Sequence, residues 1–295
     1  MNTPTRVAGF LLGIGALFGA SFAVGSAVGP VAAEPETHEE AGGHADGGHA
    51  EVAAAAEQPP GGLMTSQDGY RLVLDRTQQG PGRDQPLAFH VEGPDGMPVT
   101  AYDVEHDKRL HLIAVRRDFR GFQHVHPVLG DDGTWRVPLD LTPGPWRVFA
   151  DFHPTGGEAL TLGADLSVPG PVAATPDLPD TRVATVDGYT VTLTGDLVAG
   201  EHSALSLEVT RDGEPVTDLQ PYLGAYGHLV ALREGDLAYL HVHPGGEPGD
   251  GVTEPGPTVG FTAEVPSAGG YHLYLDFRHD GVVRTAQLAV EAGRP

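Results

Sequence analysis

The chain has 295 residues, enough for about two domains of ordinary size. Its 40 acidic residues outnumber the 17 basic ones, and the formal net charge of -23 argues against a nucleic-acid partner, because such a binder has to neutralise phosphates. The chain contains no cysteine, which excludes disulfides, thiolate metal sites and thiol nucleophiles. Its 42 glycines and 26 prolines favour short strands joined by turns.

The first strong signal along the chain is an uncharged apolar stretch at residues 7–33, directly after Arg6. It is long enough to cross a bilayer as a helix. We predict that residues 1–33 are a membrane anchor or a signal peptide, and in the second case the small residues Val31 and Ala33 would precede the cleavage site. Either alternative places the remainder outside the cytoplasm, membrane-anchored or secreted.

The next segment, residues 34–62, is acidic and lacks large apolar side chains. Such a composition cannot form a core, so we predict a disordered spacer. The segment contains His38, His44 and His49. It is either a solvated low-complexity tail or a loose, low-affinity collector of metal ions.

The rest of the chain is an internal duplication. "DGMPVT" at 95–100 recurs as "DGEPVT" at 212–217, and "FQHVHP" at 122–127 recurs as "YLHVHP" at 239–244, both at an offset of 117. A proline-rich segment at 171–182 lies between the copies. We therefore predict two domains, at residues 63–170 and 183–295, joined by this linker.

Each copy consists of short, often alternating segments separated by turn residues. The first copy supplies "YRLVLD", "PLAFHV", "LHLIAV", "TWRVPLDL" and "WRVFADF". About seven such strands per copy are typical of a two-sheet sandwich. The predicted fold class is all-β, with two tandem immunoglobulin-like antiparallel β-sandwich domains after the N-terminal helix.

The repeated histidines can be placed by strand register. In the second copy, a hairpin with Gly235-Asp236 in its loop gives paired residue numbers that sum to 471, so His228 lies opposite His243. In the first copy the sum is 237, and His111 lies opposite His126. Alternation puts the remaining histidine of each copy on the same face. We predict one metal-binding triad per repeat: His111, His124 and His126 in the first, and His228, His241 and His243 in the second.

The ligand type restricts the metal. A single His-x-His strand is more often a surface pair than a ligand pair, but a third histidine in register, repeated in a diverged copy, favours metal binding. Imidazole ligands suit Cu(II) or Zn(II), and the Irving–Williams order favours Cu(II). Binding is expected to weaken near and below about pH 6.5, where protons compete. Histidines without a counterpart in the other copy, such as His90, His106, His202, His272 and His279, are predicted to be incidental.

Two further candidates come from "WRVFADFHP". Its apolar residues alternate inward, which leaves Asp151 and His153 on the other face. The second copy keeps Asp276 but has Arg278 in place of the histidine. These aspartates either orient or ligate at a metal site, or are structural residues of a sheet edge or turn.

Residues 144–168, "GPWRVFADFHPTGGEALTLGADLSV", resemble the C-terminal strands of the CopC family of periplasmic copper carriers. That resemblance implies an immunoglobulin-like sandwich and a Cu(II) role for the Asp-x-His pair, which maps onto Asp151 and His153. Arg278 breaks the pattern in the second copy, and the His-x-His hairpin lies outside it. The duplicated sandwich is also similar to YtkA-like envelope domains.

The second copy also resembles the cupins. Their Gly-x5-His-x-His-x3-Glu motif maps onto Gly235, His241, His243 and Glu247, and their second motif maps onto Gly260, Pro266, Gly269 and His272 with one residue too many before Gly269. The first copy has Arg147 in place of His272, and the two motifs lie closer together than in a cupin. This resemblance implies a metalloenzyme whose ion keeps an open coordination position.

The expected function is therefore an extracytoplasmic metal-binding protein, rather than an enzyme, that sequesters or delivers Cu(II) or Zn(II). Its ligand is a divalent metal ion, and an envelope metal-transport protein is a candidate partner. Contact with a membrane is expected through residues 7–33 if that segment is not cleaved. Two alternatives remain open: a cupin-like metalloenzyme, and an extracellular interaction module in which the histidines only staple the hairpin or sense pH.

Overall fold

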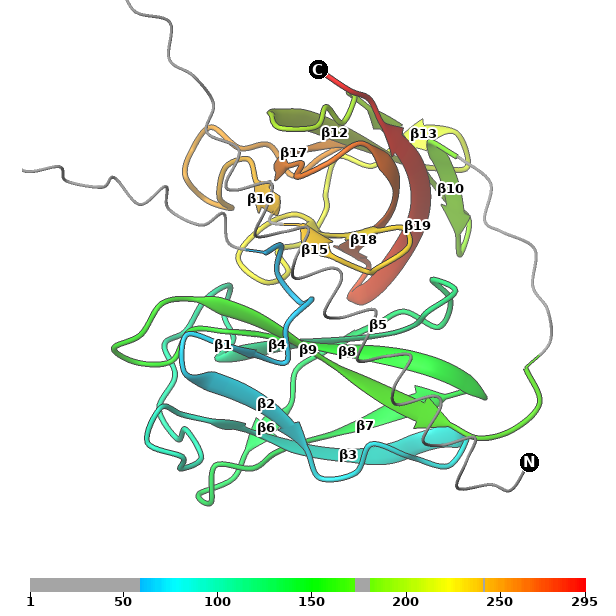
Figure 1. The fold of residues 1–295 in the computed structure, drawn as a ribbon. Coiled ribbons are helices and arrows are strands. Elements are labelled where there is room, and N and C mark those ends of the chain that lie inside the picture. The colour runs from blue at the N-terminus through cyan, green and yellow to red at the C-terminus, as the bar shows by residue number, and fades with distance from the viewer. Residues whose placement is uncertain (1–58, 173–180, 241) are drawn as a thin grey trace, which may run out of the picture. The chain divides into compact units, whose positions relative to one another are not determined.

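The structure is a computed structural model that describes residues 59–172, 181–240 and 242–295. The predicted anchor, most of the acidic spacer, the middle of the proline-rich linker and His241 lie outside the described residues. The described part consists of strands and turns without a helix, and hence without a helix long and apolar enough to cross a membrane. The prediction of an all-β fold with two tandem immunoglobulin-like sandwiches is confirmed (Figure 1).

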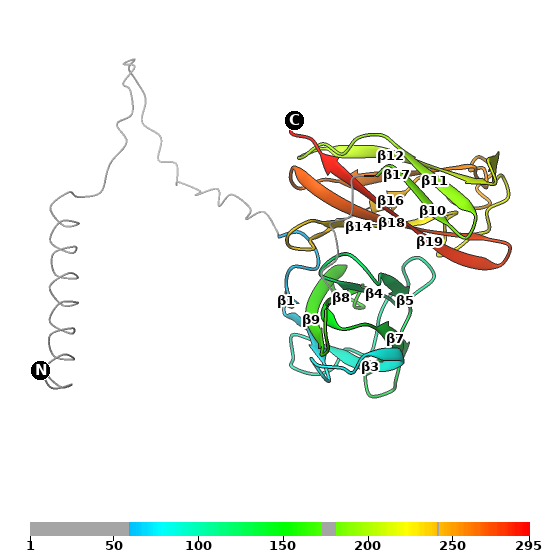
Figure 2. The same cartoon turned by 90° about the vertical axis from the view of Figure 1, so that its right-hand side faces the viewer.

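The first repeat contains two antiparallel sheets, one with the order β1-β2-β3-β7-β6 and one with the order β5-β4-β8-β9. Figure 2 shows them as two layers. The strands are β1 (Ser66–Gln67), β2 (Tyr70–Leu74), β3 (Gly82–Glu92), β4 (Leu110–Arg116), β5 (Gln123–Val125), β6 (Val128–Leu129), β7 (Trp135–Leu141), β8 (Gly144–Phe152) and β9 (Leu160–Val168).

The second repeat has the same design, with the sheets β10-β11-β12-β17-β16 and β15-β14-β18-β19, and β13 paired to β12. Its strands are β10 (Val183–Val186), β11 (Tyr189–Thr194), β12 (His202–Arg211), β13 (Glu214–Pro215), β14 (His228–Arg233), β15 (Tyr239–Leu240), β16 (Val242–Pro244), β17 (Thr258–Glu264), β18 (Gly269–His279) and β19 (Val282–Ala292).

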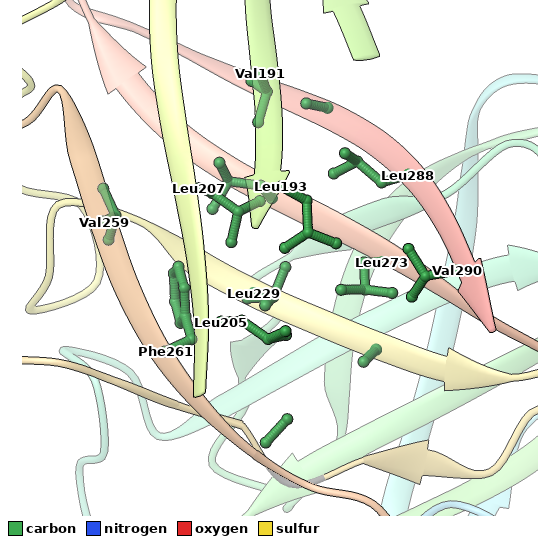
Figure 3. Packing of buried hydrophobic residues seen from close by; sticks show 14 of the residues in the cluster. Val191, Leu193, Leu205, Leu207, Leu229, Val259, Phe261, Leu273, Leu288 and Val290 are labelled. Carbon is green, nitrogen blue, oxygen red and sulfur yellow. The ribbon is translucent and has the colours of Figure 1, made fainter. Parts of the chain in front are cut away.

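Alternating side chains build a separate core inside each sandwich. In β7 the odd-numbered residues from Trp135 to Leu141 are buried and the even-numbered ones are exposed, as expected for a strand that is covered on one face. The core of the second repeat forms in the same way, with side chains such as Leu207 and Leu273 meeting between the two sheets (Figure 3). Burial of these apolar side chains is the main stabilising term for each repeat.

The central strands of the four-stranded sheets depart from this alternation. The first six residues of β4 are all buried, as are the four residues Leu229–Leu232 of β14. Both faces are covered because the outer faces of these two sheets share an apolar cluster. Its buried members are Ile113, Val115 and Phe149 from the first repeat and Val230, Leu232, Leu237 and Tyr274 from the second, with Phe119, Phe122 and Tyr239 packed against them. We call this set the inter-repeat cluster.

Equivalent aromatic residues meet twice in the inter-repeat cluster. The ring of Phe122 stacks on Tyr274 with centroids 3.9 Å apart and planes at 6°. The counterparts of these two residues, Tyr239 and Phe149, lie 5.9 Å apart at 48°. The repeats thus contact each other through the same surface, as the subunits of an isologous dimer do.

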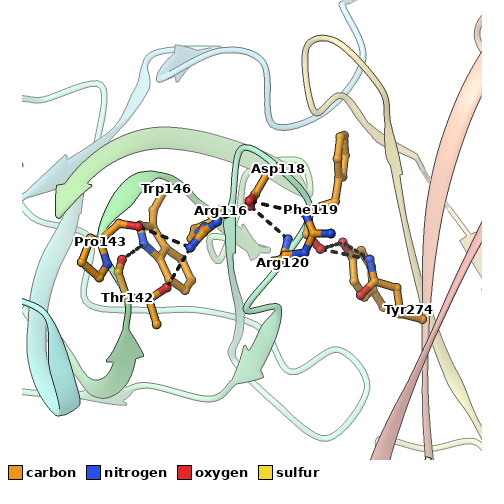
Figure 4. Close-up of polar contacts among 9 residues, drawn as sticks. Arg116, Asp118, Phe119, Arg120, Thr142, Pro143, Trp146 and Tyr274 are labelled. Carbon is orange, nitrogen blue, oxygen red and sulfur yellow. Dashed lines mark hydrogen bonds and ion pairs between the residues drawn. The ribbon is translucent and has the colours of Figure 1, made fainter. Parts of the chain in front are cut away.

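The loop between β4 and β5 adds polar contacts to this interface (Figure 4). The Tyr274 hydroxyl donates to the Phe119 carbonyl over 2.7 Å, and Gln287 Nε2 donates to the same oxygen over 3.0 Å. At the start of the loop, the guanidinium of Arg116, the last residue of β4, pairs with Asp118. The loop is therefore held from within the first repeat and anchored on the second.

Residues at the end of the predicted spacer contact both repeats. The Tyr239 amide donates to the Gly61 carbonyl over 2.9 Å, and the Gly62 amide donates to the Thr161 carbonyl over 2.7 Å. Arg147 Nη2 donates to the Gly62 carbonyl over 2.6 Å. Gly62 has φ of 72° and lies against the Phe149 ring, so only glycine fits without strain. We call residues 59–64 the N-terminal strap.

The predicted register is confirmed in the first repeat, where Leu112 pairs with Val125 and Ile113 with His124, both summing to 237. In the second repeat Ala231 pairs with Leu240, which gives the predicted sum of 471. The hairpin loop there is longer than the predicted two residues, because the Arg233 amide bonds to the Ala238 carbonyl.

The predicted pairing of His228 with His243 is wrong. After Leu240 the chain passes to the other sheet, where Val242 pairs with Ala263 and His243 pairs with Thr262. On its other edge β14 pairs with β18, where His228 lies opposite Asp276. In the first repeat the corresponding crossover follows Val125, which still pairs with Leu112 on β4.

Candidate metal centre

The structure brings the predicted triad of the first repeat together. His111 lies on β4 and is buried, with 4% of its surface exposed. Its Nδ1 atom is 3.0 Å from Nε2 of His124 and 3.3 Å from Nε2 of His126. The β4–β5 register brings about this convergence. His124 pairs with Ile113, two residues along β4 from His111, and His126 follows Val125, which pairs with Leu112 next to His111.

A histidine of the second repeat completes the cluster. The ring of His228 stacks on His111 with centroids 5.5 Å apart and planes at 7°, and lies 4.8 Å from the His124 ring. His111, His124 and His228 each offer one ring nitrogen, and these three nitrogens lie within 4.8 Å of one another. The candidate site therefore draws on both repeats, whereas the sequence predicted a separate site in each.

The partners of the outer ring nitrogens indicate where the protons lie. Nε2 of His111 is 3.2 Å from the Glu105 carbonyl, and Nδ1 of His124 is 2.8 Å from Oδ2 of Asp276. Both oxygens accept, so these nitrogens donate. In neutral rings, the nitrogens that face each other across 3.0 Å then both carry lone pairs. Such a contact is satisfied by a shared additional proton or by a metal ion.

Asp276 orients His124 from the opposite repeat. Oδ1 of Asp276 also accepts from the Thr285 hydroxyl over 2.5 Å, which fixes the carboxylate. A ligand histidine that donates its second nitrogen to a carboxylate is the usual outer-shell arrangement at metal sites. The prediction of a metal role for Asp276 stays a prediction, and the geometry favours orientation over direct ligation.

The spacing of the facing nitrogens matches that of metal ligands. Bonds of about 2.0–2.1 Å separate neighbouring nitrogens by about 3.3–3.4 Å around a tetrahedral ion and by about 2.9 Å around a square-planar one. The 3.0 Å and 3.3 Å distances from Nδ1 of His111 lie in this range. These two nitrogen–nitrogen distances are therefore compatible with coordination of one ion.

Burial disfavours the charged form of three histidines of the cluster, His111, His126 and His228. Desolvation, with a further contribution from His124, lowers the pKa of His111 to about 3. The same two causes lower the pKa of His126 to about 4, and burial places the pKa of His228 well below its usual value. At neutral pH these three rings offer lone pairs, which is the form that binds metal.

The second predicted triad is not brought together as a group. His241 lies outside the described residues, and His243 is exposed on β16 in the other sheet of its sandwich. His228 belongs to the cluster of the first repeat. Among the residues that the structure describes, the set of His111, His124 and His228 is the one group of three potential ligands.

The remaining candidates lie apart from the cluster or beside it. His153 bonds to Glu105 Oε1 over 2.9 Å and to the Gly157 carbonyl over 3.0 Å, and the carboxylate raises its pKa. Asp151 pairs with His111 in strand register and accepts from the Thr161 hydroxyl over 2.9 Å. The Asp-x-His pair of the CopC resemblance is thereby split, because only its aspartate adjoins the cluster.

The cupin-like set is not assembled either. His243 and Glu247 are exposed, on β16 and in the turn after it. His272 is buried on β18, in the other sheet, where it bonds to Glu234 over 2.8 Å and stacks on Phe119. Opposite sheets of the sandwich carry these side chains, so they cannot share one ion.

Two residues near the cluster were not predicted from the sequence to belong to the site. His106, predicted to be incidental, has its ring centroid 6.1 Å from His111 and 5.7 Å from His228. Tyr222 lies 6.4 Å from the His126 ring, and burial together with Asp276 raises its pKa to about 12. Neither residue repeats in the other copy, so the comparison between copies carried no signal for them.

The fold and this geometry define a class: a duplicated immunoglobulin-like β-sandwich protein with a histidine cluster between its repeats. The chain belongs to the family described as a domain of unknown function (DUF8832), whose model matches residues 65–170 and 184–294. The two matches coincide with the two repeats and confirm the duplication. Among curated proteins, no sequence matches the chain.

Solved structures with similarity to the chain include surface proteins of bacteria. They include the Escherichia coli adhesin FdeC (17% identity, 77% of this chain and 65% of that chain, TM-score 0.26), the Yersinia pseudotuberculosis adhesin InvE (12%, 76% and 59%, 0.24) and a putative membrane anchored protein from Corynebacterium diphtheriae (11%, 78% and 60%, 0.22). The chain spans less than two thirds of each of them. Scores this low define no common fold, so the fold assignment rests on the strands of this chain.

Proposed function

We propose that the protein is an extracytoplasmic metal-binding protein that holds one Cu(II) or Zn(II) ion between its two repeats and sequesters or delivers it. The observation that carries the proposal is the convergence of ring nitrogens on Nδ1 of His111, at 3.0 Å from His124 and 3.3 Å from His126. His228 offers a further ligand from the second repeat. A pair of facing lone pairs is unfavourable without a cation, and a metal ion relieves it.

Two sequence features support the location and the cargo. The apolar stretch at 7–33 is suited to export or to anchoring in a membrane, which leaves an envelope metal-transport protein as a candidate partner. The chain contains no cysteine, and none of its three methionines belongs to the repeated histidine motifs, so imidazole is the ligand type that these motifs offer. Imidazole selects Cu(II) or Zn(II) over Cu(I).

The direct test is titration of the full chain with Cu(II) and with Zn(II) by calorimetry. We expect one tight site per chain, because the described ligands form one group rather than two. Replacement of His111, His124 and His228 by glutamine is expected to remove it. A matched variant with His153→Gln and His202→Gln should keep it, since these histidines lie outside the cluster.

The histidines at 38, 44 and 49 need a control of their own. A variant in which all three are replaced should lose only weak binding, because the spacer offers no register that holds them together. A tight site that survives replacement of the cluster, or its absence from the unmodified chain, would contradict the proposal. Competition between the two metals then identifies the cargo, with Cu(II) favoured by the Irving–Williams order.

A further inference from the structure

The buried cluster is reached on one side by a turn that carries an exposed histidine. The turn spans residues 105–108, where the Glu105 amide bonds to the Lys108 carbonyl over 2.8 Å and the Lys108 amide bonds back to the Glu105 carbonyl over 3.0 Å. His106 has φ of 47° and Asp107 has φ of 64°, as in a type I′ turn. This backbone fixes the place from which the His106 side chain extends.

The same turn contacts the proposed ligands twice. The Glu105 carbonyl accepts from Nε2 of His111 over 3.2 Å, which directs the other nitrogen of that ring into the cluster. The His106 ring lies edge-on to His111 and to His228, at interplanar angles of 70° and 72°. His106 is exposed, whereas His111 is buried. It therefore stands between solvent and one ligand from each repeat.

The corresponding turn of the second repeat shows that the histidine is not needed for the turn itself. Residues 222–225 make the same two reciprocal backbone bonds, over 2.8 Å and 3.2 Å. Their central residues are Leu223, with φ of 55°, and Gly224, with φ of 75°. A leucine serves at the position that corresponds to His106. The imidazole is thus an addition to the turn beside the cluster.

We infer that His106 is the exchange ligand of the metal site, which takes the ion from solvent or from a donor and passes it to His111 and His228. The inference rests on the proposed metal-binding function. A buried site needs an entry path, and an ion moves along it fastest when an incoming ligand replaces the leaving one at each step. An exposed imidazole next to two buried ones supplies such a step, and it does so without adding to the equilibrium ligand set.

The test separates the rate of exchange from affinity in the full chain. His106→Asn keeps a residue that tolerates positive φ, and His106→Leu copies the second repeat. Each variant and the unmodified chain are loaded with Cu(II), and transfer to excess EDTA is followed by stopped-flow absorbance. Competition titration gives the dissociation constant, and circular dichroism checks folding. His202→Gln, an exposed histidine on β12, is the matched control.

We expect both His106 variants to slow transfer about tenfold, which corresponds to a higher barrier for exchange. Their dissociation constants should stay within about threefold of the unmodified chain. Unchanged transfer rates would overturn the inference, and so would a loss of affinity as large as that of His111→Gln, which would make His106 an equilibrium ligand. Absence of binding by the unmodified chain would instead refute the proposed function itself.

Discussion

Asp276 of the second repeat accepts a hydrogen bond from Nδ1 of His124 of the first repeat over 2.8 Å. Both side chains are almost fully buried, with 3% and 1% of their surface exposed. The contact joins two strands that belong to different sandwiches, β18 and β5. A residue of one repeat thereby sets the orientation of a candidate ligand in the other. A measurement of metal binding by variants of Asp276 therefore tests whether the two repeats dock in this way.

Asp276→Asn is expected to weaken Cu(II) or Zn(II) binding about 10- to 100-fold, because the His124 ring loses the carboxylate that orients it and increases its basicity. Calorimetric titration measures the change. Asp280→Asn is the matched control, since Asp280 is exposed and pairs with Arg211 on the surface. Equal affinities for the two variants would show that Asp276 does not act on the site.

The metal-free protein is expected to lose stability as the pH falls from about 6.5 towards about 4. Burial lowers the pKa of His111 to about 3, so the unfolded chain, with an ordinary imidazole pKa of about 6.5, binds the proton first. The contribution of His111 to the free energy of unfolding is therefore fully present above about pH 6.5. Below that pH it decreases by up to about 1.4 kcal/mol per pH unit.

Urea denaturation at pH 7.0, 6.0 and 5.0 measures this dependence. His111→Gln should flatten it, although His126 and His228, whose pKa values are also lowered, keep part of the slope. His202→Gln should leave the slope unchanged. The same depressed pKa values predict that metal binding persists below pH 6.5, a lower limit than the ordinary imidazole pKa had indicated.

Metal binding is expected to stabilise the two repeats together. An ion at a concentration about 100 times its dissociation constant adds about 2.7 kcal/mol to the free energy of unfolding. His228 is the proposed ligand from the second repeat. His228→Gln should therefore remove most of that increment from the second repeat, while the triad of the first repeat keeps a weaker site. Differential scanning calorimetry with and without Zn(II) tests this, and an equal increment in the variant would contradict the inter-repeat site.

Tyr274 allows the apolar and polar parts of the interface to be separated. Tyr274→Phe removes the hydrogen bond to the Phe119 carbonyl, which keeps its bond from Gln287, and should cost about 1 kcal/mol. Tyr274→Ala also removes the ring stacked on Phe122 and should cost about 3–5 kcal/mol. Chemical denaturation measures both. If the alanine variant is no less stable than the phenylalanine variant, the inter-repeat cluster contributes nothing.

The N-terminal strap can be tested with a pair of glycines. Gly62 and Gly96 have similar φ values of 72° and 77°, but a Cβ on Gly62 would overlap the Phe149 ring, whereas one on Gly96 would meet no atom within 4 Å. Gly96→Ala should cost about 1–2 kcal/mol for the left-handed conformation alone. Gly62→Ala should cost about 1–3 kcal/mol more, from overpacking. Similar losses of stability in the two variants would show that Gly62 is not packed against the Phe149 ring.

The strand pattern and the register of the first hairpin could be predicted because they depend on neighbours in sequence. The pairing of Leu112 with Val125 follows from alternation and loop length. The same logic failed for His243, because the residue at which a strand crosses to the other sheet depends on how the sheets pack. Val242 pairs with Ala263, while its counterpart Val125 stays on β4.

The merging of two predicted sites into one could not be predicted, because it depends on how two folded domains dock. A signal was present in the strands that contribute to the interface. "LHLIAV" and "HLVALR" are apolar almost without alternation, as strands covered on both faces are. Recognition of that pattern would have indicated that the outer faces of these sheets are buried, and hence that His111 and His228 face the other repeat.

The N-terminal strap gives the protein a mechanical property. Gly61 is bonded to Tyr239 in the second repeat, and Gly62 is bonded to Thr161 in the first. A pulling force applied to the chain ahead of Pro59 would therefore load the junction between the repeats before it reached either core. Such a force would strain the interface that carries the histidines while both sandwiches stayed folded.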